Sequence, residues 1–305
     1  MDHRILIASL PDDLRRRLTE KSDAIGGGRV IAYFCALAVT ASYIAVGAPF
    51  WWALLLPHGI MLIFLFTLLH ETSHATVFAT TWPNRWVSAV CGFLVFVPAI
   101  WFRYFHLAHH RHTHDPDHDP ELAAPKPETP AAYLWHISGL PVWWSQLKTL
   151  AQNAAGNVDY PYLPDTAKPR VVVEARVTLS LYAGLALASL AVGSTILLWI
   201  WLIPAALGQP FLRLYLLAEH GRCPHVANML ENTRTTFTNR IVRWLAWNMP
   251  YHAEHHAYPA VPFHKLPEFH AHTQAHLRQT ENGYARFNRG YLAAIAAEAG
   301  AAPVK

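Results

Sequence analysis

Two long stretches of this 305-residue chain, residues 30–69 and 177–212, contain no Asp, Glu, Lys or Arg. A helix needs about 20 apolar residues to cross a bilayer, so each stretch can hold two spanning helices and the turn that joins them. The small residues in "VGAPF" and "AVGS" mark the expected turns. We therefore predict two transmembrane helical hairpins, with spans over approximately residues 30–48, 51–70, 174–191 and 195–214.

The composition agrees with an all-α integral membrane protein. Only 14% of residues are charged and 53% are hydrophobic, whereas roughly a quarter of the residues in soluble domains are charged. The Lys and Arg residues are scattered and form no basic stripe, which argues against nucleic-acid binding. The three cysteines are far apart and lack CxxC spacing, so we expect neither a disulfide framework nor a cysteine metal site.

The basic residues predict the orientation in the membrane. Lys and Arg precede both hairpins and are missing from both predicted tips, which places the two chain ends in the cytoplasm. The first residues mix both charge signs without a continuous apolar run, so we expect no cleaved signal peptide. Residues 103–170 and 215–305 are polar and should form one cytoplasmic helical cap within a single domain, 1–305. A proline-rich loop is expected at residues 115–132.

Nine of the 20 histidines form a pattern of three boxes, "HETSH", "HLAHH" and "HAEHH", and one isolated residue in "AEHG". Offsets of three and four place side chains on one helix face. Imidazole suits iron, zinc, copper and nickel, and nine donors are too many for one ion, so the pattern predicts a site for two metals. Burying the rings without a shared partner would cost roughly 1–3 kcal/mol each, which disfavours a purely structural role. The candidate ligands are His70, His74, His106, His109, His110, His220, His252, His255 and His256.

The apolar segment 86–102 must be reconciled with this shared site. Its 17 residues are at the lower limit for a span. A crossing there would place "HLAHH" on the opposite side of the membrane from "HETSH". We therefore expect segment 86–102 to be re-entrant or to lie along the membrane interface.

Two other functions fit parts of the pattern. "HETSH" matches the zinc-protease motif HExxH, in which Glu71 would activate water, but that reading leaves most of the histidines unexplained. A metal transporter would carry its histidines inside the spanning helices. The boxes here lie outside the charge-free stretches or at their edges, which argues against transport.

The three boxes, in this order around two apolar pairs, resemble the membrane-bound fatty acid desaturase and hydroxylase superfamily. The resemblance covers most of residues 30–270, and "DPDHDPE", "ENTRTTFTN" and "NMPYHAEHHAYPAVPFHKLP" are similar to its bacterial desaturase-like branch. It implies a di-iron centre with the nine histidines as ligands and O2 as co-substrate. The first box is one residue shorter than that of the animal acyl-CoA desaturases, so an acyl-CoA carrier is not implied.

The resemblance implies oxidation of an unactivated C–H bond in a lipid-like substrate. Fatty acyl desaturation is the preferred reaction because it is the most frequent in the family. The alternative is a hydroxylase or ketolase, a monooxygenase acting on acyl chains, carotenoids or small hydrocarbon-like compounds. The chain has too few cysteines for a fused ferredoxin and no haem-binding HPGG segment. Electrons should therefore come from an external carrier, a ferredoxin or cytochrome b5-like protein with its reductase, at the bacterial inner membrane.

Several polar residues near the boxes could orient the ligands. Glu71, Asp115, Asp119 and Glu254 are candidate acceptors for imidazole N–H groups. Asn248 could reach the site through water or cap a helix. His112, His114 and His118 follow the second box, and we expect them to be solvated loop residues because the Asp and Pro residues there should end the helix.

The predicted topology can be tested by labelling. Cysteines introduced near Thr113 and near His264 should react with a membrane-impermeant thiol reagent only from the cytoplasmic side, because both places flank predicted ligand boxes. The experiment compares intact spheroplasts with inverted vesicles. Labelling of either position from the periplasmic side would contradict a site shared by the boxes.

Overall fold

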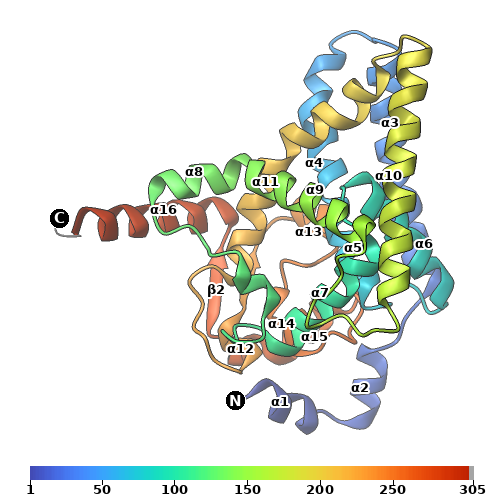
Figure 1. Ribbon diagram of the computed structural model, residues 1–305. Helices are drawn as coiled ribbons and strands as arrows, with labels where there is room; N and C mark the ends of the chain where they lie inside the picture. The colour runs from blue at the N-terminus through green and yellow to red at the C-terminus, as the bar shows by residue number, and fades with distance from the viewer. Residues whose placement is uncertain (302–305) are drawn as a thin grey trace. The chain divides into compact units, whose positions relative to one another are not determined.

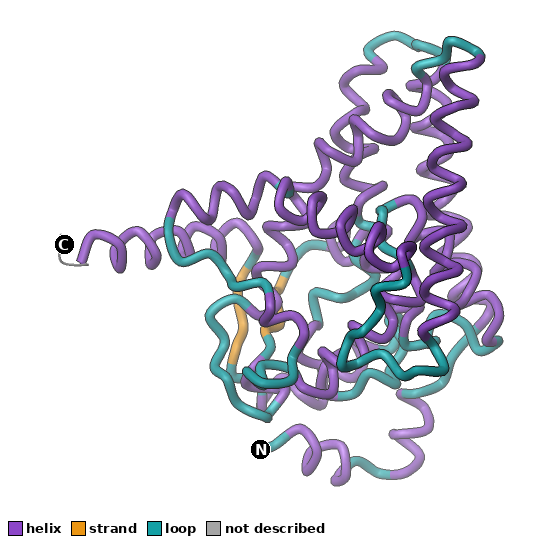
Figure 2. The backbone as a smooth tube through the Cα atoms, in the orientation of Figure 1, coloured by secondary structure: helices purple, strands orange, loops and turns teal. Residues whose placement is uncertain are grey.

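The computed structural model describes residues 1–301 of the chain, which are predominantly helical (Figures 1 and 2). The longer helices are α3 (Asp23–Ala45), α4 (Leu55–Ile63), α5 (Leu65–Ser73), α6 (Thr81–Leu94), α7 (Ala99–His112), α8 (Pro130–Ser138), α9 (Leu140–Ala155), α10 (Lys168–Ala191), α11 (Ile203–His220), α15 (Leu266–Thr273) and α16 (Tyr284–Ala301). Shorter helices are α1 (His3–Ser9), α2 (Asp12–Leu18), α12 (Met229–Asn232), α13 (Arg240–Leu245) and α14 (His252–Ala257). The strands β1 (Arg234–Phe237) and β2 (Gln279–Asn282) pair in parallel.

The chain forms two compact units. The first, called the cap unit below, comprises Met1–Lys21, Ala108–Pro141 and the residues from Arg213 onward. The second, called the span unit, comprises Ser22–Leu107 and Val142–Leu212. Helix α7 continues from the span unit into the cap unit, as does α11.

Four segments among residues 1–301 are long and apolar enough to cross a membrane: Asp12–Ala45, Trp51–Ser73, Lys168–Ala191 and Leu198–His220. Each overlaps one of the spans expected from the sequence. Apolar side chains on these helices point outward, and Val39, Leu187 and Leu190 are all at least 66% exposed. Outward-facing apolar surface of this extent suits lipid. The all-α membrane class predicted from the sequence is confirmed.

The ambiguous segment 86–102 is divided between two helices. Helices α6 and α7 meet at an angle of 102° across a short break, which is the geometry of a broken span or a re-entrant loop. Phe96 in the break adopts a left-handed backbone with φ of 63°. Gly92 lies so close to this turn that a Cβ atom on it would be 2.4 Å from the Val97 carbonyl oxygen. A straight helix over residues 86–102 is therefore absent.

A close backbone approach and a buried histidine hold the span unit together. A Cβ atom on Gly59 of α4 would be 2.0 Å from the Pro204 carbonyl oxygen at the start of α11, so only glycine fits there. His58 is 2% exposed; its Nδ1 lies 2.7 Å from Thr40 Oγ1 and its Nε2 lies 2.9 Å from the Ile200 carbonyl oxygen. This histidine outside the boxes is thus a hydrogen-bonded core residue.

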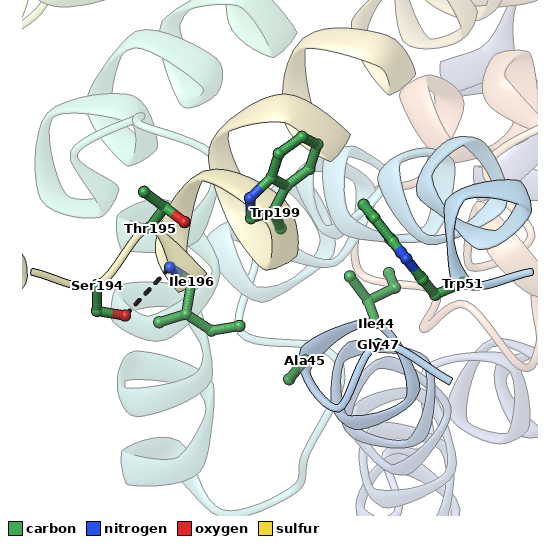
Figure 3. A pocket seen from close by; sticks show the side chains of 8 residues that line it. All are labelled: Ile44, Ala45, Gly47, Trp51, Ser194, Thr195, Ile196 and Trp199. Atoms are coloured by element: carbon green, nitrogen blue, oxygen red, sulfur yellow. Dashed lines mark hydrogen bonds between the residues drawn. The ribbon is translucent and has the colours of Figure 1, made fainter. Parts of the chain in front are cut away.

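A hollow lies between the two hairpin tips of the span unit (Figure 3). It is lined by Ile44, Ala45, Gly47, Trp51, Ser194, Thr195, Ile196 and Trp199. Trp51 and His70 are at opposite ends of the segment Trp51–Ser73, roughly 28 Å apart along a helix at 1.5 Å per residue. The hollow is therefore remote from the first histidine box.

The core of the cap unit includes a cluster of α8, α11 and α16 residues around Tyr133, Leu217 and Phe287. Asn288 of α16 accepts a hydrogen bond from the Tyr133 hydroxyl (2.9 Å) and donates to the Leu214 carbonyl oxygen (3.0 Å). These bonds fix the C-terminal end of α11, where His220 lies.

Glu174 of α10 anchors the start of α7 within the span unit. Its carboxylate accepts hydrogen bonds from the backbone N–H of Ile100 (2.9 and 3.0 Å) and of Trp101 (3.4 Å). The first N–H groups of a helix have no partner inside the helix, and the positive end of its dipole favours an anion there. Glu174 therefore caps the helix that carries the second histidine box.

Replacing Glu174 should loosen α7. Glu174→Ala removes the hydrogen bonds that its carboxylate accepts from the first N–H groups of α7. A hydrogen bond to a charged group contributes about 1.5–3 kcal/mol to the free energy of unfolding. We expect a lower melting temperature in detergent and a lower metal content. The matched control is Val173→Ala, at a neighbouring exposed position. Equal melting temperatures for the two variants would show that the cap contributes nothing to stability.

Candidate metal centre

Three histidines from the first two boxes meet in the span unit. The ring nitrogens that His70, His74 and His106 offer lie within 4.8 Å of one another. The His74 and His106 Nε2 atoms are 2.8 Å apart, and the His70 and His106 ring centroids are 4.1 Å apart. His70 and His106 are buried. We refer to these three residues as the span-unit cluster.

The turn after α5 fixes the first box. His74 ends α5, and Ala75 then adopts a left-handed backbone with φ of 57°. The Arg103 guanidinium of α7 donates to the carbonyl oxygen of Ser73. This bond ties the end of the first box to the helix that carries His106.

A second group of histidines meets in the cap unit. His109 of α7, His220 of α11 and His256 of α14 offer ring nitrogens within 4.8 Å of one another, and all three are buried. The His220 Nε2 atom lies 3.2 Å from both His109 Nε2 and His252 Nε2. We refer to His109, His220, His252 and His256 as the cap-unit cluster.

The remaining two candidates lie against this cluster. The ring of His110 stacks on that of His256, with centroids 4.0 Å apart, and the His255 ring lies 4.8 Å from that of His110. The isolated His220, predicted from its place in the sequence alone, lies among the box histidines. Seven of the nine predicted candidates thus lie in the two clusters, and His110 and His255 lie against the cap-unit cluster. Helix α7 supplies His106 to the span unit and His109 and His110 to the cap unit.

Hydrogen bonds determine which nitrogen of two rings carries a proton. Asp119 Oδ1 lies 2.9 Å from His109 Nδ1 and therefore accepts its N–H. Thr113 Oγ1 donates its only hydrogen to the His109 carbonyl oxygen (2.7 Å), so it accepts from His256 Nδ1 at 3.1 Å. In the neutral rings, the Nε2 atoms of His109 and His256 consequently carry lone pairs.

These lone pairs fit a metal ion. Nδ1–H bonded to a carboxylate or hydroxyl, with Nε2 left as the donor, is the usual arrangement of metal-bound histidine. Two nitrogens each about 2.1 Å from one ion, at an angle near 100°, would lie about 3.2 Å apart. The separations of 3.2 Å around His220 Nε2 match this spacing. Among residues 1–301, nothing forms a hydrogen bond with the buried Nε2 of His256.

Burial keeps the His256 ring neutral, as metal binding requires. Burial and then the neighbouring imidazoles of His252 and His220 hold the pKa of His256 well below its ordinary value. Protonation therefore does not compete for its Nε2 atom near neutral pH. The donor set is rich in imidazole nitrogen, which suits iron, zinc, copper or nickel.

Two of the acidic residues predicted to orient ligands have clear partners. Asp119 holds His109, as described, and its other oxygen accepts from the His114 backbone N–H (2.8 Å). Glu254 of α14 is fully buried and accepts hydrogen bonds from Thr235 Oγ1 and His270 Nδ1. Glu254 thereby fixes the short helix that carries the third box.

The other three predicted residues lie in different surroundings. Glu71 is buried and accepts from Thr76 Oγ1 (2.8 Å). Asp115 lies at the surface, where its Oδ2 is 2.9 Å from His118 Nδ1. Asn248 donates its side-chain amide to the Phe263 carbonyl oxygen (3.0 Å), which holds the proline-containing loop after the third box.

The expectation of solvated loop residues after the second box is wrong for His114. His118 is exposed and His112 is half-buried, but His114 is only 5% exposed, and its Nδ1 donates to the Pro224 carbonyl oxygen (3.1 Å). Burial and the neighbouring His225 lower the pKa of His114 to about 4. The loop folds back onto the cap unit instead of extending into solvent, because the Asp119 carboxylate binds the His114 N–H.

Three residues near the cap-unit cluster were not predicted. Thr113 holds His256, Glu219 Oε1 lies 3.4 Å from His252 Nδ1, and Glu121 Oε2 lies 3.3 Å from His109 Nε2. Glu219 immediately precedes His220, and Glu121 ends "DPDHDPE", so the sequence carried a signal for both.

Two comparisons with known proteins agree with this geometry. The family model described as "Fatty acid desaturase" matches residues 24–288. The chain is 25% identical over 299 residues to "Dihydrorhizobitoxine desaturase" of Bradyrhizobium elkanii, covering 90% of this chain and 81% of that protein.

The role of Asp119 can be tested through metal binding. Asp119→Ala removes the acceptor that holds His109 in its metal-binding tautomer, so metal affinity should fall roughly tenfold to a hundredfold. Asp117→Ala, in the same loop at an exposed position, is the control. The measurement is metal content after dialysis against a graded series of chelator concentrations. Unchanged retention in Asp119→Ala would show that this carboxylate does not support a ligand.

Proposed function

Because this membrane protein belongs to the fatty acid desaturase family and is therefore an oxidoreductase, we propose that it is an O2-dependent di-iron enzyme that desaturates a fatty acyl chain. The observation that carries the proposal is the pair of largely buried histidine clusters, in which the ring nitrogens of His70, His74 and His106, and those of His109, His220 and His256, lie within 4.8 Å of one another. The span-unit cluster would hold one iron and the cap-unit cluster the other, with α7 supplying ligands to both.

Iron bound there would supply the reduction of O2 and the removal of hydrogen from an unactivated C–H bond. The protein's own residues prepare the ligands. Asp119 and Thr113 hold protons on the Nδ1 atoms of His109 and His256, so each ring would bind a metal through the lone pair of its Nε2. The burial of both clusters excludes bulk water from the reacting atoms, which limits side reactions of an oxidant.

The preference for desaturation rests on the family and on the named relative, which is a desaturase. Hydroxylation is the alternative, since oxygen transfer and second hydrogen removal differ only in how the substrate carbon lies relative to the metals. The name of the relative also supports a second substrate class, compounds related to dihydrorhizobitoxine instead of an acyl chain. A zinc protease built on "HETSH" would not account for His106 joining His70 and His74.

Electrons would arrive from a separate ferredoxin or cytochrome b5-like carrier with its reductase. Arg and Lys side chains outside the spans would attract an acidic carrier. We place the enzyme in the bacterial inner membrane, with both termini and the histidine clusters on the cytoplasmic side, as the basic residues that flank the hairpins favour.

The reaction type can be tested in membranes that contain the protein. They are supplied with reductant, a carrier with its reductase, O2 and a mixture of acyl lipids, and the products are analysed by mass spectrometry. We expect a product that has lost two hydrogens and whose formation stops without O2. A product that has gained one oxygen would establish the hydroxylase alternative, and bound zinc with O2-independent peptide cleavage would contradict the proposal.

The third box can be tested with two matched histidines. His255→Ala should abolish turnover and lower the iron content, because its side chain lies against His110 within the cap unit. His264→Ala should do much less, because it follows Pro259 and Pro262 and its ring contacts Phe263. Both variants are compared in membranes at equal expression with excess reductant. Loss of iron from His264→Ala, with iron retained by His255→Ala, would contradict the assignment of the box.

A further inference from the structure

A third histidine group lies at the surface of the cap unit, outside both metal clusters. His112 is the last residue of α7, and Asp115 and His118 lie in the loop that follows. The ligand atoms that these three residues offer all lie within 4.8 Å of one another. His112 and Asp115 are half-buried and His118 is exposed. Solvent exposure alone does not explain why two imidazoles gather beside one carboxylate.

The two oxygens of the Asp115 carboxylate have separate partners. Oδ1 accepts a hydrogen bond from the Asp117 backbone N–H (3.0 Å), which fixes the direction of the carboxylate. Oδ2 lies 2.9 Å from His118 Nδ1 and 3.8 Å from His112 Nδ1. The two imidazole rings lie side by side, with centroids 5.2 Å apart and planes tilted by 31°. One carboxylate oxygen and two ring nitrogens therefore converge on the same small region of the surface.

The backbone holds these side chains in place. The Asp115 N–H donates to the His112 carbonyl oxygen (2.7 Å), and the His118 N–H donates to the Asp115 carbonyl oxygen (3.3 Å). Asp119, the next residue, is buried and accepts the His114 backbone N–H (2.8 Å), which fixes the inner side of the loop. Donors that are already held in place lose little conformational freedom when an ion binds.

The charge around the group favours a cation. Helix α7 ends at His112, and the C-terminal end of a helix carries partial negative charge. The carboxylates of Asp115 and Asp117 add negative charge within the loop. The His118 side chain is 63% exposed, so an ion from solvent reaches the group without any rearrangement of the fold.

We propose that His112, Asp115 and His118 form a surface site for a divalent transition-metal ion, separate from the two histidine clusters. Donors 2.9 and 3.8 Å apart, each about 2.1 Å from one ion, would subtend angles of about 90° and about 130°, on either side of the tetrahedral angle. The ion would take the place of the hydrogen between Asp115 Oδ2 and His118 Nδ1. Water would complete the coordination on the exposed side.

The donor set indicates the class of ion. Two imidazoles and one carboxylate, with positions left open, are typical ligands of Zn²⁺ and of non-haem Fe²⁺. Mg²⁺ and Ca²⁺ prefer sites built from oxygen alone. Because the group is open to solvent and supplies only three donors, its ion should exchange readily with the buffer, and a chelator in solution should remove it before metal leaves the buried clusters.

A bound ion would restrain the loop after the second box. It would join the end of α7 at His112 to His118, six residues later, and so brace the turn that leads directly into Asp119. The Asp119 carboxylate lies 2.9 Å from His109 Nδ1. Occupancy of the surface site should therefore reduce the mobility of the loop that supports the His109 ring.

The test uses full-length protein in detergent, washed with a chelator and then titrated with Zn²⁺ by isothermal titration calorimetry. The wild type should bind one Zn²⁺ per chain that His118→Ala does not bind at the same concentrations. The affinity of this ion should fall roughly a hundredfold or more in His118→Ala, because even a residue that only orients a metal ligand contributes about tenfold to a hundredfold. His272→Ala, in α15 of the cap unit, is the control and should bind Zn²⁺ as the wild type does.

A second pair of variants separates ligation from the general attraction of an acidic loop. Asp115→Asn keeps an oxygen that accepts the Asp117 N–H but loses the charge, so it should weaken Zn²⁺ binding strongly. Asp117→Asn removes the same charge from a neighbouring exposed position and should have a small effect. Hydrogen–deuterium exchange gives an independent measurement: Zn²⁺ should slow exchange over residues 113–119 in the wild type and leave it unchanged in His118→Ala.

Three results would overturn the surface site. The first is equal Zn²⁺ binding by the wild type and His118→Ala. The second is Zn²⁺ uptake matched by an equal loss of the metal already bound, which would assign the Zn²⁺ to the buried clusters. The third is an equal effect of Asp115→Asn and Asp117→Asn, which would leave only the charge of the loop. The comparison between variants holds whatever metal the clusters contain, so its outcome is independent of the proposed function.

Discussion

Buried imidazole lone pairs that face one another are the constraint on which the rest of the structure depends. Hydrogen bonds to Asp119 and Thr113 fix the protons of His109 and His256 on Nδ1, so the lone pairs of their Nε2 atoms face the cluster. Burying a ring nitrogen such as His256 Nε2, with which nothing among residues 1–301 forms a hydrogen bond, costs roughly 1–3 kcal/mol. A bound cation would accept these lone pairs and remove this cost, so metal binding should raise the stability of the cap unit.

The helices serve this constraint by bringing the boxes into position. The chain turns by 102° between α6 and α7, and Glu174 caps α7 where it begins. That turn allows His106 to reach His74, with their Nε2 atoms 2.8 Å apart. One helix then offers His106 on the span unit and His109 on the cap unit, three residues apart. The bend between α6 and α7 therefore determines where the histidines of the second box lie.

Much of this could be predicted from the sequence, because charge-free stretches and offsets of three and four are direct consequences of bilayer thickness and helix geometry. The spans and the nine histidines follow from these two rules. The conformation of the loop after the second box could not be predicted from the sequence, because it depends on which carboxylate points inward. Asp119 is buried and binds the loop, whereas Asp115, four residues earlier, lies at the surface. The positions of His114 and Glu121 could not be predicted for the same reason, because their contacts with the cluster arise only when the loop folds back.

The measurement that tests the central claim most directly is the metal content of the full-length protein, purified anaerobically in detergent after expression in iron-replete cells. The account predicts close to two irons per chain, both lost when His109 and His74 are replaced together and one retained when either is replaced alone. One tightly bound zinc per chain, or iron that remains after both replacements, would contradict it.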